Sequence, residues 1–345
     1  MIKIGINGFG RIGRAITRII SNSQNIKIMA INDIDDDVKN LAYLLKYDSI
    51  YGRFKQQVKT EKKNQISIGN NKINFYSKEI INDVPWHKHN IDIVIDSSGV
   101  EKNVINSKKI IGKKLSKVII THSPDKNIDF TLILGVNEKN YDNKKHNIVS
   151  SSICDASALG PILYQLEKYY GIDSGYVTTL HPRLSYQNLL DGSLKSVSNP
   201  GHNWKDYSLG RDSIVNLIPK KTTAVKAVTK CIKSLTNKIS GMSFRVPTSI
   251  VCASDITIKL STKVTKIKLL NHFKKLSVSQ KNIFDFQEDP LVSLDHLGTT
   301  RSVIVDANFI DVIDTNLLKM VIWYDNEWGY SNRVVDIAKF IYKKK

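Results

Sequence analysis

Short apolar runs alternate with segments of helical periodicity over the first 150 positions of the chain. Four runs predict strands: 2–7, 26–31, 91–96 and 117–120. Isoleucines that recur at helical spacing predict a helix over 11–21, and a second helix is expected over 38–45. Strands alternating with helices favour a doubly wound parallel sheet, whose ligand cleft lies at the carboxyl ends of the strands.

Beyond about residue 150 the periodicity changes to two, which is typical of a mostly antiparallel sheet with one wet face. Strands are predicted over 175–180, 242–260, 301–306 and 318–324, and helices over 156–170 and 266–276. The chain is therefore α/β, with an α+β second domain. We expect domains at 1–150, completed by a C-terminal helix at 330–345, and at 151–329. The segment 182–210 lacks periodicity and predicts a long functional loop.

The chain is strongly basic, with a net charge of +19 over 345 residues. Its 42 lysines and 9 arginines are spread along the sequence without an arginine-rich block. This favours a solvated basic surface, while binding of nucleic acid stays an alternative. No apolar run reaches the roughly 18–20 residues of a membrane span, and the first 20 residues do not form a signal peptide. We therefore expect a cytoplasmic protein without a membrane partner.

A glycine-rich turn follows the first predicted strand and opens the first helix. It reads Gly8-Phe9-Gly10-Arg11-Ile12-Gly13, and Asp33 ends the next strand 20 residues after Gly13. In a Rossmann-type domain such a turn receives a pyrophosphate at the helix N-terminus, and the acid accepts hydrogen bonds from the adenosine ribose. An acid there repels a 2′-phosphate, so the sequence predicts NAD rather than NADP.

Cys154 is the candidate nucleophile, because it directly precedes a predicted helix. The helix dipole would lower the pKa of its thiol. His181 ends a predicted strand and is a candidate general base. Spacing alone leaves open that Cys154 is a small core residue and His181 a satisfied strand-end histidine. The other two cysteines lie in apolar patterns and are interpreted as core, and the three together show no spacing typical of disulfides or a metal site.

Over nearly its full length the sequence resembles the glyceraldehyde-3-phosphate dehydrogenase family, which includes erythrose-4-phosphate dehydrogenase. The matching segments are IGINGFGRIGR at 4–14, LLKYDSIYGRF at 44–54, GVN at 135–137, FRVPT at 244–248 and WYDNEWGYSNRVVD at 323–336. The resemblance implies NAD-dependent oxidation of a phosphorylated aldehyde through a cysteine thioester. Inorganic phosphate then releases the product as an acyl phosphate.

Site residues follow from the resemblance position by position. Cys154 matches the family's nucleophile and His181 its catalytic histidine. The implied cofactor contacts are Gly8, Gly10, Arg11, Ile12, Gly13, Asp33, Lys78, Thr121 and Asn326. The implied substrate contacts are Thr222 and Arg245, together with Thr223 and Arg183. The segment 182–210 matches a loop between subunits, which implies a homotetramer.

The chain departs from the family where phosphate is bound. The family pattern Ser-Cys-Thr-Thr-Asn is replaced by Ile153-Cys154-Asp155-Ala156-Ser157, Leu184 and Leu209 stand at usual threonine and arginine positions, and the usual Thr-Gly becomes Thr222-Thr223. If Asp155 points inward, it repels phosphate and raises the pKa of the thiol. At a helix start it is equally a favourable capping residue. Arg183, Lys220, Lys221 or Ser185 could rebuild an anion site.

Three functions therefore compete. The first is phosphate-dependent oxidation of glyceraldehyde 3-phosphate. The second keeps NAD and the cysteine but changes the aldehyde, for example to erythrose 4-phosphate, or uses water as the acyl acceptor. The third is a scaffold without catalysis that binds nucleic acid through its positive charge.

Overall fold

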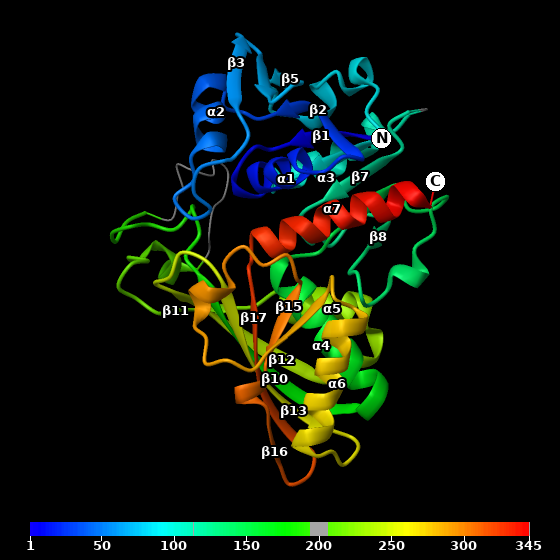
Figure 1. The fold of residues 1–345 in the computed structure, drawn as a ribbon, viewed down its shortest axis with the longest axis vertical. Coiled ribbons are helices and arrows are strands. Elements are labelled where there is room, and N and C mark those ends of the chain that lie inside the picture. Colours follow the sequence, from blue (N-terminus) through cyan, green and yellow to red (C-terminus); the bar gives the residue numbers. More distant parts are fainter. Residues whose placement is uncertain (113, 194–205, 345) are drawn as a thin grey trace. The chain divides into compact units, whose positions relative to one another are not determined.

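The structure, a computed structural model, describes residues 1–112, 114–193 and 206–344. The chain divides into two compact units (Figure 1). The first unit comprises Met1–Ile153 together with Tyr330–Lys345, and the second comprises Cys154–Gly329. Each unit is built on its own sheet.

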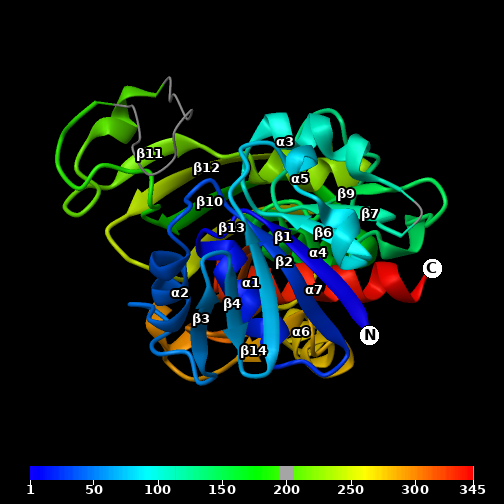
Figure 2. The same cartoon turned by 90° about the horizontal axis from the view of Figure 1, so that it is seen from above.

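The first unit contains a largely parallel sheet with strand order β3-β4-β5-β2-β1-β6-β7-β9-β8, in which β1 and β2 lie near the middle (Figure 2). Only the pairings of β4 with β3 and β5 are antiparallel. The strands are β1 (Ile2–Asn7), β2 (Ile26–Asn32), β3 (Val58–Lys62), β4 (Gln65–Ile68), β5 (Asn71–Tyr76), β6 (Ile93–Asp96), β7 (Lys117–Ile120), β8 (Phe130–Thr131) and β9 (Ile148–Ser150). Helices are α1 (Arg11–Ser21), α2 (Val38–Lys46), α3 (Glu101–Asn106) and α7 (Trp328–Lys343).

The second unit contains a mostly antiparallel sheet of order β11-β12-β10-β13-β17-β15-β14, with β16 paired to β17. Its strands are β10 (Ile172–Pro182), β11 (Ile218–Lys221), β12 (Ile239–Val246), β13 (Cys252–Leu260), β14 (Phe284–Gln287), β15 (Val303–Asp306), β16 (Asp311–Ile313) and β17 (Leu317–Tyr324). Helices are α4 (Cys154–Tyr170), α5 (Ala224–Cys231) and α6 (Lys266–Ser279), and α4 packs on β10, β13 and β15. The predicted fold class is confirmed.

The prediction of one strand over 242–260 is wrong. The chain leaves β12 at Val246 and re-enters the sheet at Cys252, and β10 lies between β12 and β13. Pro247 carries no backbone N–H for a strand ladder, and Val251 adopts a φ of 67°. Two strands on either side of β10 therefore replace the predicted single strand.

Helix α4 has 17 residues and includes Asp155, Glu167 and Lys168. Within the parts of the chain that the structure describes, no helix combines the length and the apolarity needed to cross a bilayer.

Tyr330 of α7 ties the C-terminal helix to the loops that follow β7 and β9. Its hydroxyl lies 2.8 Å from the Oγ of Ser151, 2.8 Å from the carbonyl oxygen of Thr121 and 2.9 Å from that of Ser152. Ser152 has a φ of 63°, a region that L-residues seldom occupy. One buried phenol therefore holds a strained loop in the first unit.

Replacement of Tyr330 by Phe should lower the free energy of unfolding by about 1–3 kcal/mol, because buried carbonyl groups lose a donor. Chemical denaturation of the variant and the parent protein measures the loss. Tyr43→Phe, at an exposed tyrosine of α2 in the same unit, is the control. An unchanged unfolding midpoint for Tyr330→Phe would show that the phenol does not stabilise this loop.

Candidate active site

Cys154 and His181 come from different elements of the second unit. Cys154 is the first residue of α4, and His181 stands next to the end of β10. In the sheet, His181 lies beside Arg245 of β12. The helix start thus carries the thiol, and the strand end carries the imidazole.

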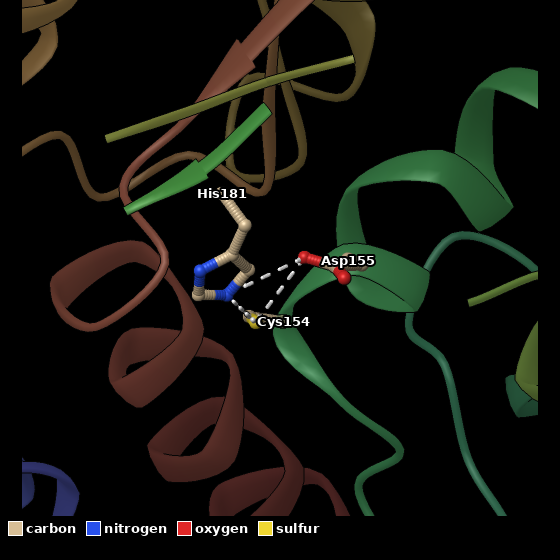
Figure 3. Close-up of side chains that lie close together, drawn as sticks. All are labelled: Cys154, Asp155 and His181. Atoms are coloured by element: carbon tan, nitrogen blue, oxygen red, sulfur yellow. Dashed lines mark hydrogen bonds and ion pairs between the residues drawn. The ribbon is translucent and has the colours of Figure 1, made fainter. Parts of the chain in front are cut away.

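Three side chains form a compact group (Figure 3). The Sγ of Cys154 lies 3.8 Å from Nε2 of His181 and 3.5 Å from Oδ1 of Asp155. The same Nε2 and Oδ1 atoms lie 3.9 Å apart. Asp155 therefore points toward the thiol and the imidazole, which answers the question that its place at the helix start left open.

The orientation of His181 is set by its own backbone neighbour. Nδ1 lies 2.7 Å from the carbonyl oxygen of Pro182, so Nδ1 carries the hydrogen and donates it. Nε2 is then an acceptor that faces the sulfur. Burial, with the positive charge of Arg245 as the second cause, lowers the pKa of His181 to about 4. The imidazole is consequently neutral near pH 7 and able to accept a proton.

Burial raises the pKa of the Cys154 thiol well above its usual value, and the carboxylate of Asp155 raises it further. The positive charge of Arg245 acts in the opposite direction. The lowering expected from the helix dipole alone is therefore reversed, because desolvation and an adjacent negative charge both disfavour the thiolate. At neutral pH the group is a thiol with a hydrogen-bond acceptor on either side.

A cationic group adjoins this cluster. Arg245 is only 9% exposed, and its Nη2 donates to the hydroxyl of Tyr186 over 3.4 Å. Its Nε and Nη1 atoms are buried and find no partner in the described chain. Burial, with the nearby positive charge of Arg245 as the second cause, lowers the pKa of Lys220 to about 8. Unpartnered guanidinium donors beside an ammonium group favour binding of an anion.

The other predicted substrate residues occupy different surroundings. Thr222 accepts from the backbone N–H of Ala224 over 3.1 Å at the start of α5, and Thr223 is exposed. Arg183 donates to Oγ of Ser249 over 2.9 Å. Among the predicted substrate contacts, Arg245 is thus the one that interacts electrostatically with both Cys154 and His181.

In the first unit, two glycines of the glycine-rich turn leave no room for a side chain. Gly8 has a φ of +90°, and a Cβ there would lie 2.5 Å from the backbone nitrogen of Ser98. A Cβ on Gly13 would lie 2.2 Å from the carbonyl oxygen of Gly8. Gly10 faces open space and begins α1 without a side-chain cap. Uncapped N–H groups beside open space fit an anionic ligand such as a pyrophosphate.

Asp33 follows β2 next to this turn. One carboxylate oxygen accepts from the N–H of Phe9 over 2.5 Å, and the other accepts from the N–H of Asp35 over 3.0 Å. Each oxygen keeps a second lone pair that can accept from a ribose hydroxyl. The turn and the acid therefore suit an adenosine diphosphate group without a 2′-phosphate.

The remaining predicted cofactor residues have defined places. Arg11 pairs with Asp48 over 2.8 Å, and Ile12 is half-buried in the first turn of α1. The exposed Lys78 donates its backbone N–H to Asn32, and Thr121 donates its own to Asp96. Asn326 belongs to the second unit, where its Oδ1 accepts from Val251. Their contacts with a cofactor stay predictions.

Sequence reasoning missed two tyrosines that adjoin the cluster of Cys154, Asp155 and His181. Tyr324, at the end of β17, donates its hydroxyl to Oδ1 of Asp155 over 2.8 Å, and Tyr186 contacts Arg245. Tyr324 lies 169 positions from Asp155, so no local pattern could link them.

Comparison with known families assigns both parts of the chain. Residues 2–104 match the model described as glyceraldehyde 3-phosphate dehydrogenase, NAD binding domain. Residues 153–326 match the model of the C-terminal domain of the same enzyme.

Proteins that match this chain over nearly its full length are named glyceraldehyde-3-phosphate dehydrogenase. The chain is 39% identical over 342 residues to glyceraldehyde-3-phosphate dehydrogenase 1 of Kluyveromyces lactis, covering 99% of this chain and 100% of that protein. It is 36% identical over 345 residues to glyceraldehyde-3-phosphate dehydrogenase 1 of Bacillus cereus, covering 100% and 99%. It is 38% identical over 347 residues to glyceraldehyde-3-phosphate dehydrogenase 2 of a Nostoc species, again covering 100% and 99%.

Asp155→Asn should accelerate alkylation of Cys154 by iodoacetamide about 10-fold near pH 7. Loss of the adjacent negative charge lowers the pKa of the thiol and so increases the fraction present as the reactive thiolate. Mass spectrometry of the Cys154 peptide over time measures the rate, with Asp173→Asn as control. A slower reaction in Asp155→Asn would contradict the electrostatic role of Asp155.

Proposed function

This chain belongs to the glyceraldehyde-3-phosphate dehydrogenase family and is an NAD-dependent dehydrogenase, and from that premise we propose that it oxidises D-glyceraldehyde 3-phosphate to an acyl phosphate. The observation that carries the proposal is the pair formed by the Cys154 sulfur and Nε2 of His181, 3.8 Å apart. A nucleophile and an oriented base within reach of each other are the minimum that thioester chemistry requires.

The cofactor would be held in the first unit by the turn from Gly8 to Gly13 and by Asp33. The N-terminus of α1 would receive the pyrophosphate, with Arg11 and Ile12 beside it, and Asp33 would accept hydrogen bonds from the ribose. The proposed contacts of Lys78, Thr121 and Asn326 complete the set. NAD, when bound, accepts the hydride that the substrate loses.

Cys154 and His181 carry the covalent step. As the sulfur adds to the aldehyde carbon, Nε2 of His181 accepts the thiol proton and returns it to the former carbonyl oxygen, so the hemithioacetal forms and the imidazole is neutral again. The imidazole then removes the hydroxyl proton of the hemithioacetal while the carbon loses its hydride, which leaves a thioester on Cys154. A neutral imidazole is needed for each transfer, and the low pKa of His181 keeps it neutral.

Inorganic phosphate then attacks the thioester carbon, the carbon–sulfur bond breaks, and the acyl phosphate leaves. Asp155 places negative charge beside the path of this anion. Arg245, with two unpartnered donors, and Lys220 supply positive charge on the same cluster. We propose that these two cations bind the anionic groups in place of the hydroxyl groups that the family usually has next to the cysteine, with Thr222, Thr223 and Arg183 in supporting positions.

Reduction of NAD by the purified protein tests the proposal, with glyceraldehyde 3-phosphate and erythrose 4-phosphate as substrates and with or without inorganic phosphate. Cys154→Ser should abolish turnover, and His181→Asn should lower kcat by about 10²–10⁴-fold. Cys231→Ser, at a cysteine outside this cluster, should retain activity. Steady turnover without phosphate would favour water as acceptor, preference for erythrose 4-phosphate would change the assigned aldehyde, and an active Cys154→Ser would overturn the mechanism.

Lys220→Met should raise the KM for the phosphorylated aldehyde or for phosphate about 10-fold, because a charge-assisted contact is lost. Lys221→Met is the matched control. Lys221 is the next residue of β11 and is exposed, so its side chain belongs to the opposite face of the strand. Equal KM values for both variants and the parent enzyme would remove Lys220 from the anion site.

We also propose a homotetramer in which the segment 182–210 lies between subunits. Part of this segment, 194–205, lies outside the described residues. Next to that part, several large apolar side chains are 48–85% exposed, which supports a buried role in an assembly: Leu189, Leu190, Tyr207, Ile214, Val215 and Leu217. Light scattering of the purified protein measures the mass, and a monomer would contradict the proposal.

A further inference from the structure

The cluster at the start of α4 brings together three different kinds of metal-ligand atom. The Sγ of Cys154, Nε2 of His181 and Oδ1 of Asp155 are separated by 3.5, 3.8 and 3.9 Å, and all lie within 4.8 Å of one another (Figure 3). Ligand atoms around a tetrahedral zinc ion lie about 3.5 Å apart, given bonds of about 2.0–2.3 Å. The triangle therefore needs only a small contraction to close around such an ion.

Two of the three ligand atoms are already oriented by a second hydrogen bond. Nδ1 of His181 donates to the carbonyl oxygen of Pro182, which leaves Nε2 with its lone pair toward the cluster. Tyr324 donates to Asp155 and holds the carboxylate beside the sulfur. In protein metal sites the imidazole ligand typically donates its other N–H to an acceptor such as a backbone carbonyl. The carboxylate ligand typically accepts a hydrogen bond from a neighbouring donor.

We propose that Cys154, Asp155 and His181 form a binding site for a thiophilic divalent cation of the Zn²⁺ class. Sulfur, imidazole and carboxylate ligands select such a cation over the hard ions Mg²⁺ and Ca²⁺. On binding, Cys154 gives up its proton to solvent and forms a metal–sulfur bond. Three protein ligands leave one position for water, as in open zinc sites.

Asp155 is what distinguishes this site from a cysteine–histidine pair. A thiol and an imidazole supply two ligands, and Asp155 adds the third together with a negative charge. The group is reachable, because Cys154 is partly exposed and the Asp155 side chain is 13% exposed. Arg245 and Lys220 act against a cation here, so binding should be reversible by a chelator rather than permanent.

If Cys154 is the nucleophile, an assignment that rests on the proposed function, the bound cation removes it from catalysis. Metal binding at the cluster then inhibits the enzyme reversibly. Binding itself is independent of that assignment, because it depends on the ligand atoms and not on turnover.

Titration of the metal-free protein with Co²⁺ tests the site directly. Thiolate ligation gives a charge-transfer band in the near ultraviolet, and one equivalent per chain should saturate it. Asp155→Asn should weaken binding at least about 10-fold, and Cys154→Ser should abolish the band. Cys231→Ser is the matched control and should bind as the parent does. Thermal unfolding of each variant verifies that it is folded.

Competition and protection complete the experiment. Zn²⁺ should displace Co²⁺ and protect the Cys154 peptide from iodoacetamide, EDTA should reverse the protection, and Mg²⁺ should have no effect. A band that survives Asp155→Asn at full strength, or one that disappears in Cys231→Ser, would overturn the site. Saturable Co²⁺ binding in a protein that reduces no NAD would support the site while refuting the proposed function.

Discussion

The hydrogen bond from Nδ1 of His181 to the carbonyl oxygen of Pro182 is the constraint on which the cluster of Cys154, Asp155 and His181 depends. It spans 2.7 Å within two consecutive residues, so the backbone at the end of β10 decides which nitrogen carries the proton. With the other tautomer, Nε2 would present a hydrogen to the sulfur and could accept nothing. Both proton transfer and metal ligation require this one choice.

Charged side chains of opposite sign surround the imidazole of His181. Asp155 faces the thiol and the imidazole from one side, and it raises the pKa of Cys154. Arg245 acts on the same two groups with the opposite sign, and Lys220 adds a second positive charge. An anionic substrate would bring negative charge to the cations, so the balance at the sulfur changes as ligands arrive. The thiol of Cys154 is thus protonated in the free protein.

Different packing constraints act in the two units. In the first, a Cβ at Gly8 or Gly13 would collide with backbone, so the turn before α1 can close only with glycine. In the second, the strand order places β10 between β12 and β13, which sets His181 beside Arg245. The first unit is therefore organised by a local turn, whereas the second is organised by register between distant strands.

Local patterns predicted much of this protein. The apolar run at 2–7, the glycine turn and the isoleucine spacing that follows it predict β1 and α1, because each depends on residues within a few positions of one another. Strand β3 was not predicted, since Val58 is its one buried residue and the strand shows no alternation. Pro247 marked a break that period-two counting overlooked.

By itself the sequence determined the two sheet types and the dinucleotide turn, and through resemblance it predicted the nucleophile and the base. Whether Asp155 caps its helix or faces the thiol was undecidable from the chain, because both choices suit an acid at a helix start. Only the tertiary structure decided it, through the hydroxyl of Tyr324 at the end of β17, 169 positions away. A contact between residues so far apart depends on strand order and register, and neither quantity is written in any local stretch of sequence.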